Sequence, residues 1–129
     1  AEAIGKIADS KSFVQEYQTA FVGIGNNKFR NELLQRLEQE GYEIPVLLHP
    51  TAYISKTAVI GKGTVVEPKA IVNANSRVGV GCIISVGAIV DHDVILEDCV
   101  HVNAGAICKA GSFVAKETKL EAGQVVKEY

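Results

Sequence analysis

The chain has 129 residues and a mass of 13.8 kDa, enough for one ordinary domain or two small ones. Hydrophobic residues make up 47% and charged residues 22%, which excludes a disordered or collagen-like protein. A formal net charge of −2 argues against nucleic acid or an anionic membrane as the main partner. With three cysteines, no signal-peptide pattern and no apolar run near the roughly 20 residues that span a bilayer, the sequence predicts a cytoplasmic protein.

A helix is predicted over residues 28–40, with Asn26 or Asn27 as its N-cap and Gly41 as its stop. A shorter helix could form over residues 11–17. The apolar residues of the longer helix are expected on one face: Phe29, Leu33, Leu34 and Leu37.

Two strands are predicted on either side of this helix, over residues 20–25 and 42–47, with Pro45 implying an edge or a strand end. Strand, helix and strand make half of a nucleotide-binding α/β unit. Gly23 and Gly25 could let a phosphate approach the N-terminal end of the helix, although a simple strand-to-helix turn explains them about as well.

A six-residue repeat begins at residue 48. The recurring aliphatic positions are Leu48, Ile54, Ile60, Val66, Val72, Val78, Ile84, Val90, Leu96, Val102, Cys108, Val114, Leu120 and Val126. Four positions after each stands a small or β-branched residue, with Gln124 as the exception. Neither a helix nor a flat strand has this period. Short strands wound around a triangular prism do, with three strands and 18 residues per coil, and thirteen hexads give slightly more than four coils.

His92 is the first candidate for chemistry, because it takes a turn position between two carboxylates, Asp91 and Asp93. A carboxylate bonded to one imidazole nitrogen leaves the other free to act as a base. A polar corner on a solenoid surface is an equally good reading. His101 lies half a coil later, so the two histidines could meet only across a contact between two prisms. His49 fits a role at the junction of the two parts.

The cysteines offer less. Cys82 and Cys108 fall on interior positions of the repeat, whereas Cys99 falls on a turn near the histidines, where a nucleophilic role is possible but not required for direct acyl transfer. No Cys-x-x-Cys spacing occurs, so no metal site is predicted.

Asp91-His92-Asp93, the nine-residue gap to His101, and then Gly105 and Gly111 resemble the hexapeptide-repeat acyltransferases. The similarity is to bacterial sugar O-acyltransferases of the sialic-acid O-acetyltransferase type and to UDP-amino-sugar N-acetyltransferases, and it extends over Gly23-Ile24-Gly25-Asn26-Asn27 and Arg30. The resemblance implies a left-handed parallel β-helix over residues 48–129 after a partial α/β, sugar-nucleotide-binding-like segment over 1–47. It also implies acetyl-CoA as co-substrate, a homotrimer, and a role in surface-glycan synthesis.

By this resemblance, His92 is expected to be the general base that acts on a sugar amine or hydroxyl, with Asp93 orienting it and Asp91 the less favoured candidate for that role. His101 is expected beside the acetyl thioester. The N–H of Gly111 is expected to stabilise negative charge on the carbonyl oxygen.

Binding residues are also implied by the resemblance. The small residues Ala104, Gly105, Ala110 and Gly111 are expected to let the pantetheine arm of acetyl-CoA lie against the prism wall. Ser85 stands where some members carry an acceptor-binding asparagine, and with Gly23 and Gly25 it completes the expected substrate-binding set.

The sequence departs from the family pattern at both ends. Members usually begin with a complete α/β domain, whereas this chain begins downstream of its glycine-rich loop, and only about four hexads follow His101. Two alternatives therefore stay open: a shortened noncatalytic β-helix that binds ligands or assembles with a partner, and an acetyltransferase for a small amine or amino acid.

Overall fold

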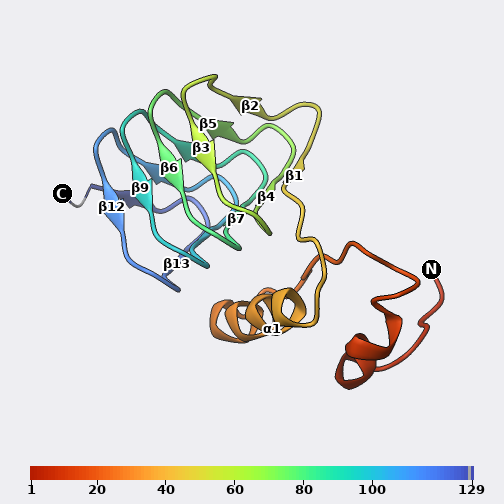
Figure 1. Ribbon diagram of the computed structural model, residues 1–129. Helices are drawn as coiled ribbons and strands as arrows, with labels where there is room; N and C mark the ends of the chain where they lie inside the picture. The colour runs from red at the N-terminus through yellow and green to blue at the C-terminus, as the bar shows by residue number, and fades with distance from the viewer. Residues whose placement is uncertain (128) are drawn as a thin grey trace.

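A triangular parallel β-helix makes up most of the protein in the computed structural model, which describes residues 1–127 and 129. Fourteen two-residue strands form three parallel sheets (Figure 1). Face 1 consists of β1 Leu47–Leu48, β4 Val65–Val66, β7 Ile83–Ile84, β10 His101–Val102 and β13 Lys119–Leu120. Face 2 consists of β2 Tyr53–Ile54, β5 Ile71–Val72, β8 Ile89–Val90, β11 Ile107–Cys108 and β14 Val125–Val126. Face 3 consists of β3 Val59–Ile60, β6 Arg77–Val78, β9 Ile95–Leu96 and β12 Phe113–Val114.

The register confirms the 18-residue coil predicted from the repeat. Each strand pairs with the strand one coil away, as His101 does with Ile83 on one side and Lys119 on the other. The second residue of every strand points into the prism, and Val66, Val72, Ile84, Val90 and Val102 are fully buried there. Leu48 is 49% exposed, because no coil covers the N-terminal end of the prism.

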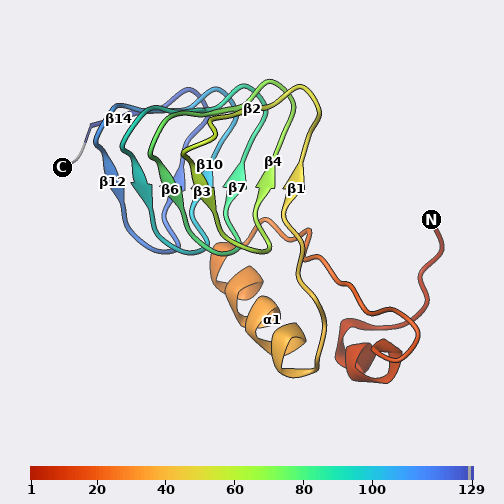
Figure 2. The same ribbon diagram turned by 45° about the horizontal axis from the view of Figure 1, so that its top comes forward.

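Three turn columns join the faces (Figure 2). We call the column between faces 2 and 3 the histidine corner (residues 55–57, 73–75, 91–93 and 109–111). The column between faces 3 and 1 is the helix corner (61–63, 79–81, 97–99 and 115–117), and that between faces 1 and 2 is the Ser85 corner (49–51, 67–69, 85–87, 103–105 and 121–123). Backbone hydrogen bonds run from coil to coil, for example from Asp93 N–H to Ala74 O at 2.9 Å.

Helix α1 (Asn27–Gln39) packs against the helix corner, as Figure 2 shows. The predicted helix is confirmed to within a residue, and Asn26 is its N-cap, its side chain accepting the Phe29 N–H at 2.9 Å. Leu33 and Leu34 are buried as expected, but Phe29 is 42% exposed, so its predicted place was wrong. The buried stripe begins at Arg30, which takes the position one residue later on the helix.

The two strands predicted before the prism are absent from residues 1–47, all of which the structure describes. These segments share one isolated parallel bridge, Thr19↔Glu43, flanked by extended backbone. A ladder cannot extend past Pro45, which has no N–H to donate. The short helix expected over 11–17 instead forms earlier, as the 3-10 helix η1 over Ile7–Phe13. None of the helices in the described residues is both long and apolar enough to cross a membrane.

Candidate active site

The helix corner is closed by a buried arginine. Arg30 is 1% exposed, and its guanidinium donates to the carbonyl oxygens of Gly81 (2.7 Å), Cys99 (3.0 Å) and Ile24 (2.9 Å). Burial lowers the pKa of Arg30, but a guanidinium stays charged at any ordinary pH. One side chain therefore ties the segment before α1 to two successive coils of the prism.

Glycine at this corner lets α1 approach. A Cβ on Gly63, at φ +71°, would lie 2.9 Å from Cδ2 of Leu34, and one on Gly81 would overlap the same leucine and reach within 3.0 Å of the Cys99 sulfur. Asn27 strengthens the contact by donating to the carbonyl oxygen of Glu117 at 2.8 Å. The helix corner is therefore packed tightly against α1.

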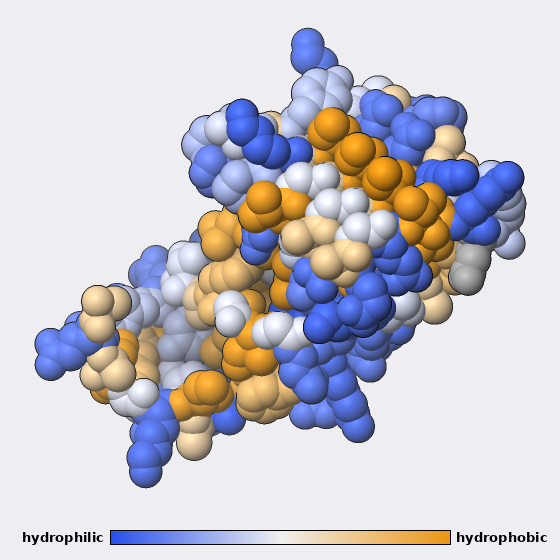
Figure 3. All heavy atoms as spheres, turned by 180° about the vertical axis from the view of Figure 1, so that it is seen from behind, coloured by the Kyte–Doolittle hydropathy of each residue, from blue (hydrophilic) through white to orange (hydrophobic). Residues whose placement is uncertain are grey.

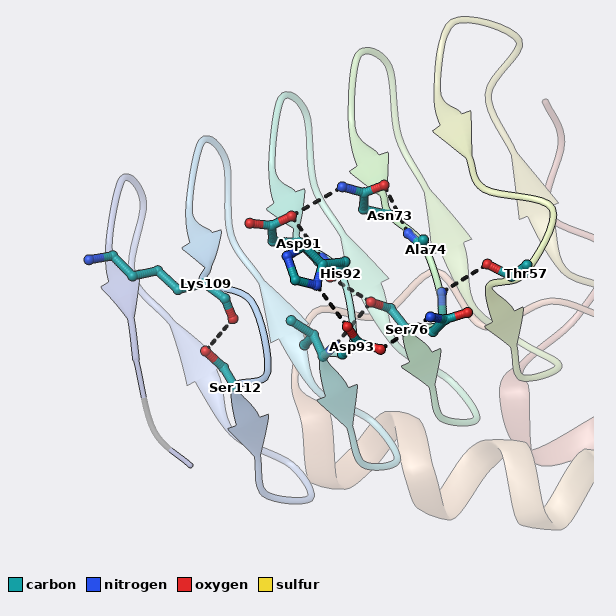
Figure 4. Close-up of polar contacts among 11 residues, drawn as sticks. Thr57, Asn73, Ala74, Ser76, Asp91, His92, Asp93, Lys109 and Ser112 are labelled. Carbon is teal, nitrogen blue, oxygen red and sulfur yellow. Dashed lines mark hydrogen bonds and ion pairs between the residues drawn. The ribbon is translucent and has the colours of Figure 1, made fainter.

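The histidine corner, in contrast, is open and polar. His92 Nδ1 lies 2.7 Å from Asp93 Oδ2, and about half of each side chain is exposed (Figure 4). The dyad needs Nδ1 protonated to donate to the carboxylate, which leaves Nε2 with a lone pair facing away from it. The predicted pairing of His92 with Asp93 thus has the geometry of an oriented base.

The backbone of this turn is fixed from both sides. Asp91 Oδ1 accepts the His92 N–H at 2.7 Å and the Asn73 side-chain amide at 3.1 Å. The buried hydroxyl of Ser76, one coil earlier, donates to the Asp91 carbonyl oxygen and accepts the Val94 N–H at 3.1 Å. Asp91 therefore contacts the main chain of His92, whereas Asp93 contacts the ring.

The charges around His92 set its protonation. The hydrogen bond that His92 donates to Asp93, helped by the nearby charge of Asp91, raises the pKa of His92 above its ordinary value. The same hydrogen bond, together with one from Asn75, lowers the pKa of Asp93. The carboxylate thus stays charged, and the imidazole holds its proton more tightly than an ordinary histidine.

His101 and Ser85 come together on another side of the prism. His101 Nε2 lies 3.0 Å from Ser85 Oγ, and its Nδ1 is buried with no hydrogen-bond partner among the described residues. Burial, followed by the nearby positive charges of Arg30 and Lys119, lowers the pKa of His101, which favours the neutral ring. Since His101 is on face 1 and His92 is on the histidine corner, one chain does not bring the two histidines together.

Two glycines of the expected site, Gly105 and Gly111, lie at different corners of the prism. Gly105 and Gly111 are turn residues at φ +65° and +74°, on the Ser85 corner and the histidine corner. The Gly111 N–H donates to the His92 carbonyl oxygen at 3.0 Å, so it is already engaged within the chain, and the oxyanion role expected for it stays a prediction. The Ala110 N–H, one residue earlier, has no acceptor among the described residues.

Gly23 and Gly25 lie in the extended segment before α1. A Cβ on either would meet nothing within 4 Å, and neither has a positive φ, so their backbone does not require glycine. The carbonyl oxygen of Gly25 accepts from Arg30 at 3.3 Å. Gly23 lines a mainly apolar cavity of about 420 Å³ between α1 and the N-terminal segment, far from His92.

All three cysteines are free and buried. Cys82 and Cys108 lie inside the prism as predicted, where burial raises the pKa of their thiols to about 12 and about 11. Cys99 lies on the helix corner beneath α1, away from His92, and burial raises its pKa too. The possible nucleophilic role of Cys99 is therefore excluded, because the group is covered and protonated. No group of three or more metal-ligating side chains occurs among the described residues.

Comparison with known proteins finds acetyltransferases of the same fold. The acetyltransferase domain of PglB from Neisseria gonorrhoeae FA1090, solved in complex with acetyl coenzyme A, is 33% identical and superposes with a TM-score of 0.93 over 98% of this chain and 62% of that one. This similarity is consistent with the resemblance to hexapeptide-repeat sugar acyltransferases. Since a superposition cannot convert a coil into its mirror image, the PglB domain and the present chain wind in the same sense.

Two other proteins are also similar to this chain. A perosamine N-acetyltransferase from Caulobacter crescentus, with one histidine replaced by asparagine and solved with CoA and GDP-perosamine, is 25% identical with a TM-score of 0.87, covering 99% of this chain and 70% of that one. UDP-N-acetylbacillosamine N-acetyltransferase of Bacillus subtilis (strain 168) is 44% identical over 45 residues, which are 35% of this chain and 21% of that protein. No protein-family model matches the chain. The chain thus spans about three fifths of the PglB domain and about a fifth of the Bacillus enzyme.

Proposed function

We propose that the protein transfers an acetyl group from acetyl-CoA to an amine of a nucleotide-linked sugar in glycan biosynthesis. The observation that carries this proposal is the exposed His92–Asp93 dyad on a β-helix shared with sugar N-acetyltransferases. Those relatives are described with acetyl coenzyme A, or with CoA and GDP-perosamine, which favours a nucleotide sugar over a free amine. Their N-acetyltransferase activity favours nitrogen over oxygen as the acceptor atom.

In the proposed reaction, the acceptor nitrogen attacks the thioester carbonyl carbon. The new C–N bond forms, the nitrogen passes a proton to His92 Nε2, and the C–S bond breaks to release CoA, whose sulfur takes the proton from His92. Asp93 holds the imidazole in the required tautomer and stabilises its positive charge. We place the Ala110 N–H, one coil after His92, at the developing oxyanion in place of Gly111.

The remaining expected residues fit a cleft between subunits. Face 2 presents an outward apolar stripe, the orange row in Figure 3. Its members are Ile71, Ile89, Ile107 and Val125, and Tyr53 precedes them on the same face. A continuous apolar stripe favours burial against another surface, and a homotrimer in which it packs on face 1 of the next chain buries it.

Such a trimer accounts for the separation of His92, on the histidine corner, from His101, on face 1. The angle at the corner of a triangular prism is smaller than the third of a full turn that each of three subunits occupies around an axis, so clefts that open outwards remain between them. One wall of each cleft ends at His92, and the other carries His101 and Ser85 of the next subunit. Gly105 then lies near the axis, and Gly23 and Gly25 approach the cleft mouth, where the acceptor enters.

Thiol release from acetyl-CoA in the presence of UDP- and GDP-linked amino sugars tests the function. The wild-type protein should release CoA with at least one of them, and His92→Gln should reduce the rate by about 10²–10⁴-fold. His49→Gln is the matched control, since His49 is exposed on another corner. Free amino acids and polyamines belong in the panel, because transfer to them alone would select the small-amine alternative. If no acceptor in the panel led to thiol release, the noncatalytic scaffold would be the better reading. A rate that His92→Gln leaves unchanged would exclude His92 as the base.

Mixing two inactive variants tests the shared cleft. Trimers reassembled from His92→Gln and His101→Ala chains should recover part of the wild-type rate, because some clefts then contain both intact histidines. Each variant reassembled alone is the control. A mixture no more active than its components would show that the reaction does not use His92 and His101 from different chains.

A further inference from the structure

We infer that Asn75 is a positioning residue that holds the carboxylate of Asp93 against His92, a role that rests on the proposed function. Asn75 lies one coil before Asp93 on the histidine corner, and its side-chain amide donates to Asp93 Oδ1 at 3.2 Å. The other carboxylate oxygen, Oδ2, faces His92 Nδ1 at 2.7 Å. Each oxygen of Asp93 therefore has one partner, and the two contacts fix the plane of the carboxylate.

Asn75 is itself fixed from the preceding coil. Its backbone N–H donates to Thr57 Oγ1 at 3.0 Å, and Thr57, Asn75 and Asp93 succeed one another at the 18-residue spacing. Figure 4 shows the dashed contacts following this column towards His92. A continuous chain of hydrogen bonds thus connects Thr57 in the first coil, through Asn75 and Asp93, to the imidazole of His92.

The turn does not need this amide for its own conformation. Asn75 has φ +59°, and the same position in six other turns is glycine at similar φ: Gly63, Gly81, Gly87, Gly105, Gly111 and Gly123. Asn75 is exposed, and an exposed hydrogen bond contributes little to folding. The Asn75 side chain therefore matters for the orientation of the Asp93 carboxylate rather than for folding.

An amide also suits the task electrostatically. A lysine or arginine would neutralise Asp93, whereas a neutral donor orients the carboxylate and leaves its charge for the imidazole. The charged groups that face His92 are Asp91 and Asp93 of its own turn. In the following coil, the ammonium group of Lys109 points away from the ring (Figure 4).

A neighbouring pair provides the matched control. Asn73 donates to Asp91 Oδ1 at 3.1 Å, as Asn75 does to Asp93, but Asp91 contacts only the backbone N–H of His92. Removing Asn73 therefore removes an equivalent amide–carboxylate contact that does not reach the ring.

The experiment compares Asn75→Gly, which keeps the positive φ without strain, with Asn73→Ala. His92 is titrated by NMR in the protein alone, its signals assigned with His92→Gln. We expect Asn75→Gly to move the His92 titration to lower pH and to reduce kcat about tenfold with the KM for acetyl-CoA unchanged. Asn73→Ala should change kcat by less than about twofold and the His92 titration by less than about 0.3 pH unit. Asn75→Gly and Asn73→Ala should both unfold like the wild type.

A double-mutant cycle decides whether Asn75 acts through Asp93. In an Asp93→Asn background, Asn75→Gly should have no further effect on the titration of His92 or on kcat. The inference would be overturned if Asn75→Gly had the same effect in the Asp93→Asn background as in the wild type. It would also be overturned if Asn75→Gly alone left the His92 titration at the same pH or moved it to higher pH. The NMR measurement needs no acceptor, so a protein that transfers no acetyl group would contradict the proposed function and still test Asn75.

Discussion

The helix corner and the histidine corner are built from the same repeating turn, yet α1 covers Gly63, Gly81 and Cys99 at one, while His92 and Asp93 are exposed at the other. At the helix corner, Gly63 and Gly81 leave space for Leu34, and Arg30 satisfies two carbonyl groups that α1 covers. At the histidine corner, the corresponding positions carry Asn75 and Asp93, whose side chains bond along the column. A regular coil thus supplies a similar backbone at both corners, and the turn residues decide which corner packs against α1 and which carries the His92–Asp93 dyad.

The largest effect on stability is expected from replacing Arg30, which holds the helix corner together. Arg30→Ala would leave the carbonyl groups of Gly81 and Cys99 buried without donors, so we expect it to reduce the free energy of unfolding by about 3–5 kcal/mol. Arg30→Lys should lose nearly as much, because one ammonium cannot span the carbonyls that the guanidinium fork reaches. Urea unfolding measures both, with Arg36→Ala on the exposed side of α1 as control. Equal midpoints for Arg30→Ala and Arg36→Ala would contradict this account of the helix corner.

A smaller effect is expected at Gly81. Gly81→Ala introduces a Cβ at φ +68° that overlaps Leu34, so we expect a loss of about 2–3 kcal/mol and easier proteolysis of residues 1–47. Gly87→Ala is the control, since Gly87 has φ +65° with nothing within 4 Å of a Cβ and loses only about 1 kcal/mol through strain. If thermal or urea unfolding gave the two variants the same stability, the close packing of α1 would be unimportant.

The smallest effect on folding, and the most informative for chemistry, is expected at Asp93. Because a base must be unprotonated, kcat/KM should rise with pH and level off above the pKa of His92, which Asp93 raises above its ordinary value of about 6.5. Asp93→Asn removes the charge, so the inflection should move to lower pH while the urea midpoint stays unchanged. Asp91→Asn should move the inflection less, since Asp91 does not contact the ring. An inflection that Asp93→Asn leaves in place would exclude His92 as the titrating base.

Most of the fold could be predicted from the sequence because period six is a global constraint. A register error at Val66 would displace every later position as far as Val126, and all these residues are buried where the repeat places them. The segment before the prism has no such constraint, so local patterns suggested strands where only the Thr19↔Glu43 bridge forms. Phe29 was misplaced for the same reason: hydrophobicity alone did not show that the neighbouring Arg30 would be buried.

The site was predicted in part. The His92–Asp93 and His101–Ser85 pairs place predicted residues together. The predicted use of the Gly111 N–H did not consider the coil-to-coil backbone bonds, one of which engages this N–H. The role of Asn75 was missed, although its signal was present in the 18-residue spacing to Asp93. Side chains stacked between coils are neighbours, so spacing within a column has to be examined as closely as spacing within a motif.

Asp93 has φ +58°, a backbone conformation that glycine adopts more easily than any other residue. Asp93→Gly should therefore relax the turn and raise the urea midpoint while removing the carboxylate from His92. The protein thus keeps a residue that strains the turn beside His92. A search for more stable variants would reach this position early, and under the proposed function the stability gained there would come with a lower kcat.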